Sequence, residues 1–343
     1  MKRSEFFLLQ SFIHYVDNTT ADINDKLYKV RNLFNMLTIR FQRHYVLNRE
    51  ITIDERMIKY TDRANFLQFI RNKPTQWGFK VFVLADAHNG YVYNWKVFTG
   101  AEPGNRRNAT QNILKELISG LHLRNHILFF DSYFAYVPCI VDFSTKGIGC
   151  VGTLQKSRRF LPNEIKNPGT MQRGDSQFRK SGNLIVLAYK DKKVVRMITN
   201  MHGAVLDNGR RPVALSDYNK WARGVDISNQ LVSSYHNNHK TMKWYKALAL
   251  SFLKTSIANA YQLFKVRNPF QVMSHLQFRE NLVVELLQEY LNQLNEQINV
   301  RPREERRLIV GMHHLQTRKQ GRCLICSTED SKKITFFIAW SVM

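Results

Sequence analysis

The stretch that most constrains the fold is an apolar run that ends in a carboxylate. In "HILFFDSYFA", the four apolar residues at 127–130 come directly before Asp131. A short, continuous apolar run of this kind is typical of a strand buried on both faces. Burying an unpaired carboxylate is costly, so such a residue ends a strand, pairs with a cation or binds a metal ion. The run therefore predicts an inner strand with Asp131 at its end, and it leaves these three roles open.

Strand-like and helix-like patterns alternate along the rest of the chain. We expect, in order, short helices within 1–48, a hairpin around Asn89-Gly90, a helix over 108–121, the strand at 127–130, a short helix closed by Gly147, a strand at 148–154, a second hairpin around Asp191-Lys192, and helices from about 225 that include an apolar stripe over 276–298. The polar, glycine-containing segment 155–182 indicates a loop or an insertion. This order favours a mixed α/β core with appended helical parts.

Charge and size narrow the class of protein. The 343 residues contain 51 Lys+Arg against 27 Asp+Glu, a net charge of +24, and 44% of them are hydrophobic. That composition is enough for a real core of one elaborated domain or roughly two domains of about 150 residues. A folded, strongly basic chain most often binds nucleic acid, because Lys and Arg replace the counterions of phosphates. A merely soluble or ribosome-associated basic protein is the alternative.

Other compartments and classes are disfavoured. No window contains 18 uncharged apolar residues, so we expect no membrane span. Gln10, His14 and Asp17 interrupt the first apolar residues, which argues against a signal peptide. Four cysteines in the whole chain argue against a disulfide framework and favour a reducing intracellular compartment.

Three aspartates lie at the expected ends of elements. Asp54 follows the alternating residues 51–53 and is expected to end or interrupt a short strand, Asp131 ends the apolar strand, and Asp226 follows Gly224 at the start of a helical run. Three such carboxylates can hold a pair of Mg²⁺ ions for phosphoryl transfer. Aspartates at helix starts also serve as caps, and those at strand ends pair with Lys or Arg, so spacing alone does not decide.

Longer motifs identify a family. The segments "ITIDERMIKY", "NKPTQWGFK" and "NGYVYNW" come first, "FFDSYFAYVPCIV" with "GCVGTLQKSRRFLP" comes second, and "YNKWARGVDISNQ" with "HKTMKWYK" and "IANAYQLFK" comes third. In this order they closely resemble the three blocks of the piggyBac-type transposases. The resemblance runs from about residue 4 to about residue 327.

The resemblance implies a fold and an activity. The fold is an α/β, RNase H-like mixed sheet flanked by helices, with an insertion between the second and third catalytic aspartates. The activity is cut-and-paste cleavage and strand transfer of double-stranded DNA at TTAA-like targets. Matched block by block, Asp54, Asp131 and Asp226 are the catalytic and metal-binding residues, with two Mg²⁺ or Mn²⁺ ions. The family also implies a nuclear protein, a homodimer and no contact with a membrane.

The same resemblance divides the chain into parts. We expect an N-terminal helical DNA-binding or dimerisation remnant at 1–48, the first part of the catalytic core at 49–152, an insertion domain at 153–212, the last part of the core at 213–265, a helical DNA-binding or dimerisation segment at 266–300, and a basic tail with an incomplete CxxC motif at 301–343.

Two departures from the family favour a truncated or decaying copy. Asn229 stands where the family typically has a further Asp, three residues after Asp226. Its amide can still offer an oxygen to Mg²⁺ or bond to Asp226, but it removes a negative charge. Cys323 and Cys326 resemble half of a Zn²⁺ domain, and no later Cys or His completes it. A domesticated or degenerate DNA-binding protein without catalysis is therefore the alternative to an active transposase.

Basic clusters are the expected DNA contacts. The cations expected at phosphates are Arg158, Arg159, Arg210, Arg211, Lys240 and Lys243. Trp244 lies beside this last lysine, where its ring can stack on unpaired bases or belong to the core.

Overall fold

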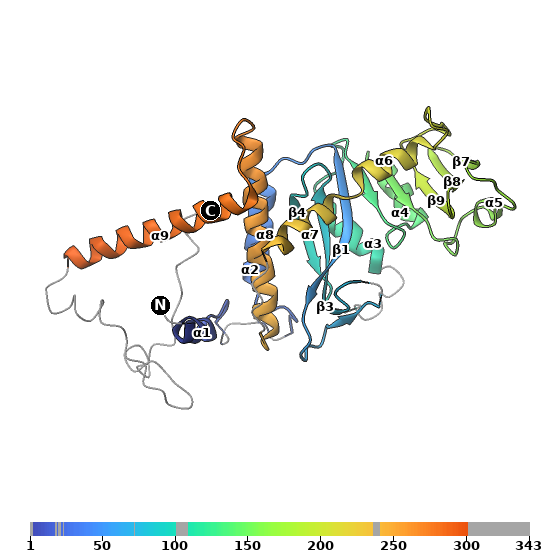
Figure 1. The fold of residues 1–343 in the computed structure, drawn as a ribbon. Helices are drawn as coiled ribbons and strands as arrows, with labels where there is room; N and C mark the ends of the chain where they lie inside the picture. Colours follow the sequence, from blue (N-terminus) through green and yellow to red (C-terminus); the bar gives the residue numbers. More distant parts are fainter. Residues whose placement is uncertain are drawn as a thin grey trace. The chain divides into compact units, whose positions relative to one another are not determined.

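The computed structural model describes residues 3–300 apart from 18, 20, 21, 23, 72, 101–108 and 236–240. It divides into two compact units (Figure 1). One unit, residues 14–271, contains the sheet and most of the helices, and the other contains α1 (Arg3–Phe12) and α9 (His275–Val300). The expected helical stripe at 276–298 falls on α9. Within the described parts, no helix combines the length and the apolar character that a membrane span requires.

One mixed sheet forms the centre of the larger unit. Its strands are β1 (Glu50–Lys59), β2 (Gln68–Phe69), β3 (Trp77–Asp86), β4 (Val92–Val97), β5 (Ile127–Phe130), β6 (Gly149–Thr153), β7 (Ser176–Ser181), β8 (Leu184–Lys190) and β9 (Val194–Thr199). The order is β2-β3-β1-β5-β6-β9-β8-β7, and β4 also pairs with β3. β4, β3 and β1 are antiparallel neighbours, whereas β5 and β6 run parallel to β1. β9, β8 and β7 extend the same sheet from β6, each antiparallel to the strand before it in this order.

Helices cover both faces of the sheet. They are α2 (Arg31–His44), α3 (Ala109–Leu117), α4 (Val137–Thr145), α5 (Asn163–Lys166), α6 (Val213–Trp221), α7 (Gly224–Ser234) and α8 (Trp244–Arg267). Trp95 of β4 packs against Phe34 of α2 and Phe252 of α8, which lie side by side in Figure 1. The preceding residue, Asn94, donates to the carbonyl of Leu117 in α3. Because successive strand residues point to opposite faces, α2 and α8 lie on one face and α3 on the other.

Several expected elements are confirmed. β3 and β4 form the hairpin around Asn89-Gly90, where Gly90 adopts a φ of 76° that favours glycine. β8 and β9 form the second hairpin around Asp191-Lys192. The apolar run at 127–130 is β5, and all four of its residues are buried between β1 and β6. The inner-strand interpretation of this run is therefore correct.

Three local expectations were wrong. Asp54 neither ends nor interrupts a strand, because β3 pairs with β1 along its whole length and carries it on to Lys59. The loop alternative for residues 155–182 is wrong, because they contain α5 and the edge strand β7, none of whose residues is buried, whereas the insertion alternative stays a prediction. Helical structure after β9 begins with α6, just after Pro212, and not near 225.

Candidate metal centre

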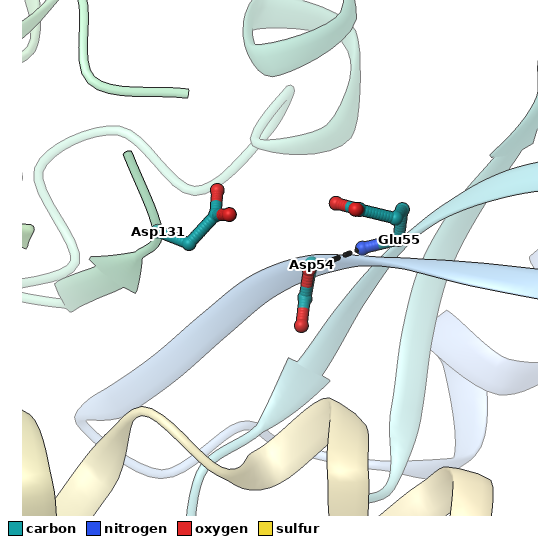
Figure 2. A group of neighbouring side chains, drawn as sticks. All are labelled: Asp54, Glu55 and Asp131. Carbon is teal, nitrogen blue, oxygen red and sulfur yellow. Dashed lines mark hydrogen bonds between the residues drawn. The ribbon is translucent and has the colours of Figure 1, made fainter. Parts of the chain in front are cut away.

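The end of the ladder between the parallel strands β1 and β5 brings Asp54 and Asp131 together. Pairing between β1 and β5 stops at Ile53 and Phe130, so the next residue of each chain segment leaves the ladder at the same level. The carboxylate oxygens of Asp54, Glu55 and Asp131 offer ligand atoms that all lie within 4.8 Å of one another (Figure 2). The structure thus joins two of the three predicted aspartates and adds a glutamate.

Sequence reasoning missed Glu55. Strand alternation assigns it to the face opposite Asp54. Both side chains nevertheless reach the same place, because β1 has passed the end of β5 there. The backbone N–H of Glu55 donates to Asp54 Oδ1 at 2.7 Å, and Figure 2 shows its carboxylate pointing toward Asp131. The signal available in the sequence was adjacency to Asp54 in "ITIDERM".

Burial and mutual repulsion change the acidity of this cluster. Burial, and then the neighbouring Glu55, raises the pKa of Asp54 to about 7. Burial and the charge of Glu55 also raise the pKa of Asp131. Burial acts to raise the pKa of Glu55 as well, but a hydrogen bond with Asp54 and the charge of Lys73 hold it below its usual value. The cluster therefore holds more negative charge than a buried site favours, and a bound cation would neutralise part of this charge.

The donor set fits a hard divalent cation. Three carboxylates offer the oxygen ligands that Mg²⁺ and Mn²⁺ prefer. Lys73 Nζ lies 3.2 Å from Glu55 Oε1, whereas Glu55 Oε2 is buried without a hydrogen-bond partner. A buried oxygen without a partner is costly, and a bound cation would satisfy it. Asp54, Glu55 and Asp131 are the residues that would hold the ion.

Asp226 lies on α7, outside this group of three. It lies in the first turn of the helix, as the sequence predicted, and it is exposed. Gly224 lets α7 approach the sheet, since a Cβ there would lie 2.6 Å from the carbonyl oxygen of Asp86 and 2.7 Å from Thr52 Oγ1. The glycine that precedes Asp226 is therefore required by packing against β1 and the end of β3.

Tyr218 of α6 links the three predicted aspartates electrostatically. Burial is the main cause that raises the pKa of its phenol, a hydrogen bond with Thr153 opposes this rise, and the negative charges of Asp131, Asp54 and Asp226 add to it. The phenol thus lies within range of all three carboxylates. The sequence offered Tyr218 only as part of the "YNK" element, and its chemistry gave no reason to single it out.

The other expected metal ligands have different surroundings. Asn229 Oδ1 accepts a hydrogen bond of 2.6 Å from Nε of Arg56. Cys323 and Cys326 lie outside the described residues, so the expected Zn²⁺ site stays a prediction.

The expected DNA contacts fall into two groups. Arg158 is partly buried and donates from Nη2 to the carbonyls of Ser132 and Tyr133, directly after Asp131. Its position therefore supports the loop that carries Asp131. The exposed residues of the set are Arg159, Arg210, Arg211 and Lys243, and Lys240 lies outside the described residues.

Trp244 has aromatic neighbours within the protein. Its ring is partly buried, with its centroid 5.4 Å from that of Phe66 and 6.2 Å from that of Tyr28. This packing favours the core role over base stacking.

Comparison with known proteins gives concordant matches. The family model described as Transposase IS4 matches residues 1–261. Human PiggyBac transposable element-derived protein 2 is 23% identical over 363 residues, covering 96% of this chain and 60% of the relative. Human PiggyBac transposable element-derived protein 3 is 25% identical, covering 95% of this chain and 59% of the relative. The chain thus spans about three fifths of the length of these curated relatives.

A solved structure agrees with the fold. The cryo-EM structure of a piggyBac transposase synaptic complex with hairpin DNA superposes with a TM-score of 0.81 at 22% sequence identity. The match covers 97% of this chain and 71% of that one. The sheet order around β1 and this superposition identify the fold as RNase H-like, as the motifs implied. With a family model that matches most of its length, the chain belongs to the Transposase IS4 family and is piggyBac-like.

Proposed function

We propose that this chain carries the catalytic core of a piggyBac-type DNA transposase, which cuts double-stranded DNA and joins it to TTAA-like targets. The observation that carries the proposal is the meeting of Asp54 and Asp131 where the pairing between the parallel strands β1 and β5 ends, with their oxygens within 4.8 Å. Family membership supplies the reaction class, and the acidic cluster supplies a place for it.

The residues have distinct roles in this proposal. Asp54 and Asp131 would hold the divalent ions, and Asp226 would complete their set of ligands. Ions bound there would activate the attacking oxygen and stabilise the leaving one during phosphodiester cleavage. The pairing of β1 with β5, which ends just before Asp54 and Asp131, keeps these two carboxylates in place, because both strands lie inside the sheet. Glu55 adds a third oxygen ligand, and its ion pair with Lys73 fixes the direction of its carboxylate.

DNA is the proposed partner. The excess of Lys and Arg gives the chain the charge that binding to phosphates requires. The matched piggyBac transposase is in a synaptic complex with hairpin DNA, which supports the same class of partner for this chain. We also propose action in the nucleus as a homodimer, on the basis of the resemblance to the family.

A cleavage assay tests the proposal. The full chain would be incubated with a supercoiled plasmid that contains TTAA and the DNA flanking this gene, with Mg²⁺ or Mn²⁺. We expect nicked and linear products, and we expect Asp131→Ala to abolish them while DNA affinity stays nearly unchanged. Cleavage that survives Asp131→Ala, or that needs no divalent ion, would contradict the proposal.

A DNA-binding protein of the same fold without catalysis is the second candidate. Two observations favour it: Asp226 does not belong to the group of oxygens within 4.8 Å, and Asn229 is neutral. This candidate predicts salt-sensitive binding to the same plasmid without cleavage, in the wild-type chain and in Asn229→Asp alike.

A further inference from the structure

A buried arginine close in sequence to the acidic cluster has only neutral hydrogen-bond partners within the described part of the chain. Arg56 lies two residues after Asp54 on β1, so the two side chains leave the same face of the strand. Its side chain is 6% exposed. Nε donates to Asn229 Oδ1 at 2.6 Å, Nη2 to Ser228 Oγ at 2.7 Å and Nη1 to Thr255 Oγ1 at 2.8 Å. Each nitrogen of the guanidinium therefore has one acceptor.

These acceptors connect three elements. Ser228 and Asn229 belong to α7, and Thr255 belongs to α8, so one side chain of β1 bonds to both helices. Gly90, in the β3–β4 turn, also lies against α7, since a Cβ there would be 2.7 Å from the backbone nitrogen of Ser228. The network is therefore part of the close contact that fixes α7 on the sheet.

No carboxylate among the described residues joins this network. An arginine guanidinium stays protonated in proteins, so this buried side chain is a cation at neutral pH. A buried cation without an anion is costly, and its retention needs well-directed hydrogen bonds. A carboxylate in place of one neutral acceptor would supply the missing charge.

Asn229 has a role in this network that differs from metal binding. It lies three residues after Asp226, one helical turn further on, and its oxygen already accepts the Nε proton. We propose that Arg56 is a positioning residue that ties α7 to β1 and so sets the place of Asp226 relative to Asp54, with Asn229 as its acceptor and not as a metal ligand. The link to Asp226 rests on the proposed function, whereas the link between Arg56 and Asn229 does not.

A double-mutant cycle on stability tests the link. In the full chain, Asn229→Asp places a carboxylate on Nε of Arg56, and we expect the unfolding equilibrium constant in urea to fall about tenfold, because charge-assisted hydrogen bonds are stronger. In an Arg56→Met background the same change leaves a half-buried carboxylate without its cation, so the constant should rise. Gln230→Glu, an amide-to-carboxylate change at the exposed neighbouring position of α7, is the control and should change little in either background.

A milder variant keeps the test usable if Arg56→Met does not fold. Arg56→Lys retains the charge but cannot reach three acceptors at once. The stabilisation by Asn229→Asp should then be smaller than in the wild-type background. An effect of Asn229→Asp that is equal with and without the arginine would overturn the proposal.

Mn²⁺ binding supplies a readout that a purely structural role would not move. Asp226→Asn should weaken Mn²⁺ binding in the wild-type chain and have little further effect in Arg56→Met or Arg56→Lys, where α7 is no longer held. Asn229→Asp should change Mn²⁺ binding no more than Gln230→Glu does. Tighter Mn²⁺ binding by Asn229→Asp with unchanged unfolding would show a metal-ligand position and overturn the proposal.

The two proposals can fail separately. If Asp226→Asn leaves Mn²⁺ binding unchanged in the wild-type chain, Asp226 is not a metal ligand and the proposed function is wrong on this residue. The stability cycle still decides whether Arg56 and Asn229 are linked.

Discussion

The sheet side and the helix side of the candidate centre are held by different means. On the sheet side, Asp54 and Asp131 meet because two neighbouring strands end their pairing at the same level. On the helix side, Asp226 depends on the seating of α7, which involves Gly224 and a hydrogen bond between residues 173 positions apart in sequence. Register places the first pair of carboxylates, and long-range side-chain contacts place the third. The helix side should therefore be the easier one to displace without losing the sheet.

The largest expected effect on stability comes from the seating of α7. Gly224→Ala would put a Cβ within 2.6 Å of a backbone carbonyl oxygen, which cannot move aside as a flexible side chain can. We expect a loss of about 3 kcal/mol in the free energy of unfolding, as for other overpacked positions. Urea denaturation measures it. Gly203→Ala, where the nearest atom is a side-chain methyl group of Val205 at 3.2 Å, is the matched control and should cost much less. Equal losses in the two variants would show that α7 is not tightly seated.

The sheet side should show an intermediate effect through pH. The pKa of Asp54 is raised in the folded chain from 3.8 to about 7, so the folded state binds this proton more tightly than the unfolded state. The contribution of this group to the free energy of unfolding is fully present below about pH 4 and is lost as the pH rises through about 7. We expect a decline of about 2 kcal/mol without divalent ions, because the lowered pKa of Glu55 offsets part of the shift. Asp54→Asn should reduce the decline to the part that the raised pKa of Asp131 contributes, and the surface variant Asp191→Asn should leave it intact. A flat profile in the wild-type chain would contradict the buried, mutually repelling cluster.

The smallest effect concerns the loop after Asp131. Arg158→Ala removes the donor to the carbonyls of Ser132 and Tyr133, so the carboxylate should be held less firmly. Supporting contacts of this kind typically change metal affinity by about tenfold or more. Mn²⁺ titration should show this weakening for Arg158→Ala, while the exposed neighbour in Arg159→Ala should affect only DNA binding. Identical Mn²⁺ affinity in the two variants would contradict the supporting role of Arg158 and leave DNA binding as its expected role.

The sequence was informative where local pattern decides the structure. The apolar run before Asp131 predicted an inner strand, and Asn89-Gly90 predicted a hairpin, because burial and turn chemistry act over a few residues. The prediction of Asp54 as a site residue depended on the family motif. Its neighbours in sequence suggested the end of a strand, whereas pairing with β3 extends β1 beyond Asp54.

The remaining parts of the site depend on contacts that local patterns do not encode. Glu55 joins the cluster only because β1 continues beyond the end of β5, and strand alternation alone places it on the other face. Arg56 and Asn229 are ordinary residues when taken singly, and their pairing forms only when α7 lies on β1. Residues that join distant elements are thus harder to predict than residues in a local motif.

Mn²⁺ binding to the full chain tests the central claim most directly, namely that Asp54 and Asp131 form one divalent-ion site. Free Mn²⁺ can be followed by electron paramagnetic resonance during titration of the wild-type chain, Asp54→Asn, Asp131→Asn and the surface control Asp191→Asn. We predict saturable binding in the wild-type chain and in the control, with affinity about tenfold or more lower in each of the two cluster variants. Wild-type affinity in both cluster variants, or no Mn²⁺ binding in the wild-type chain, would contradict the account.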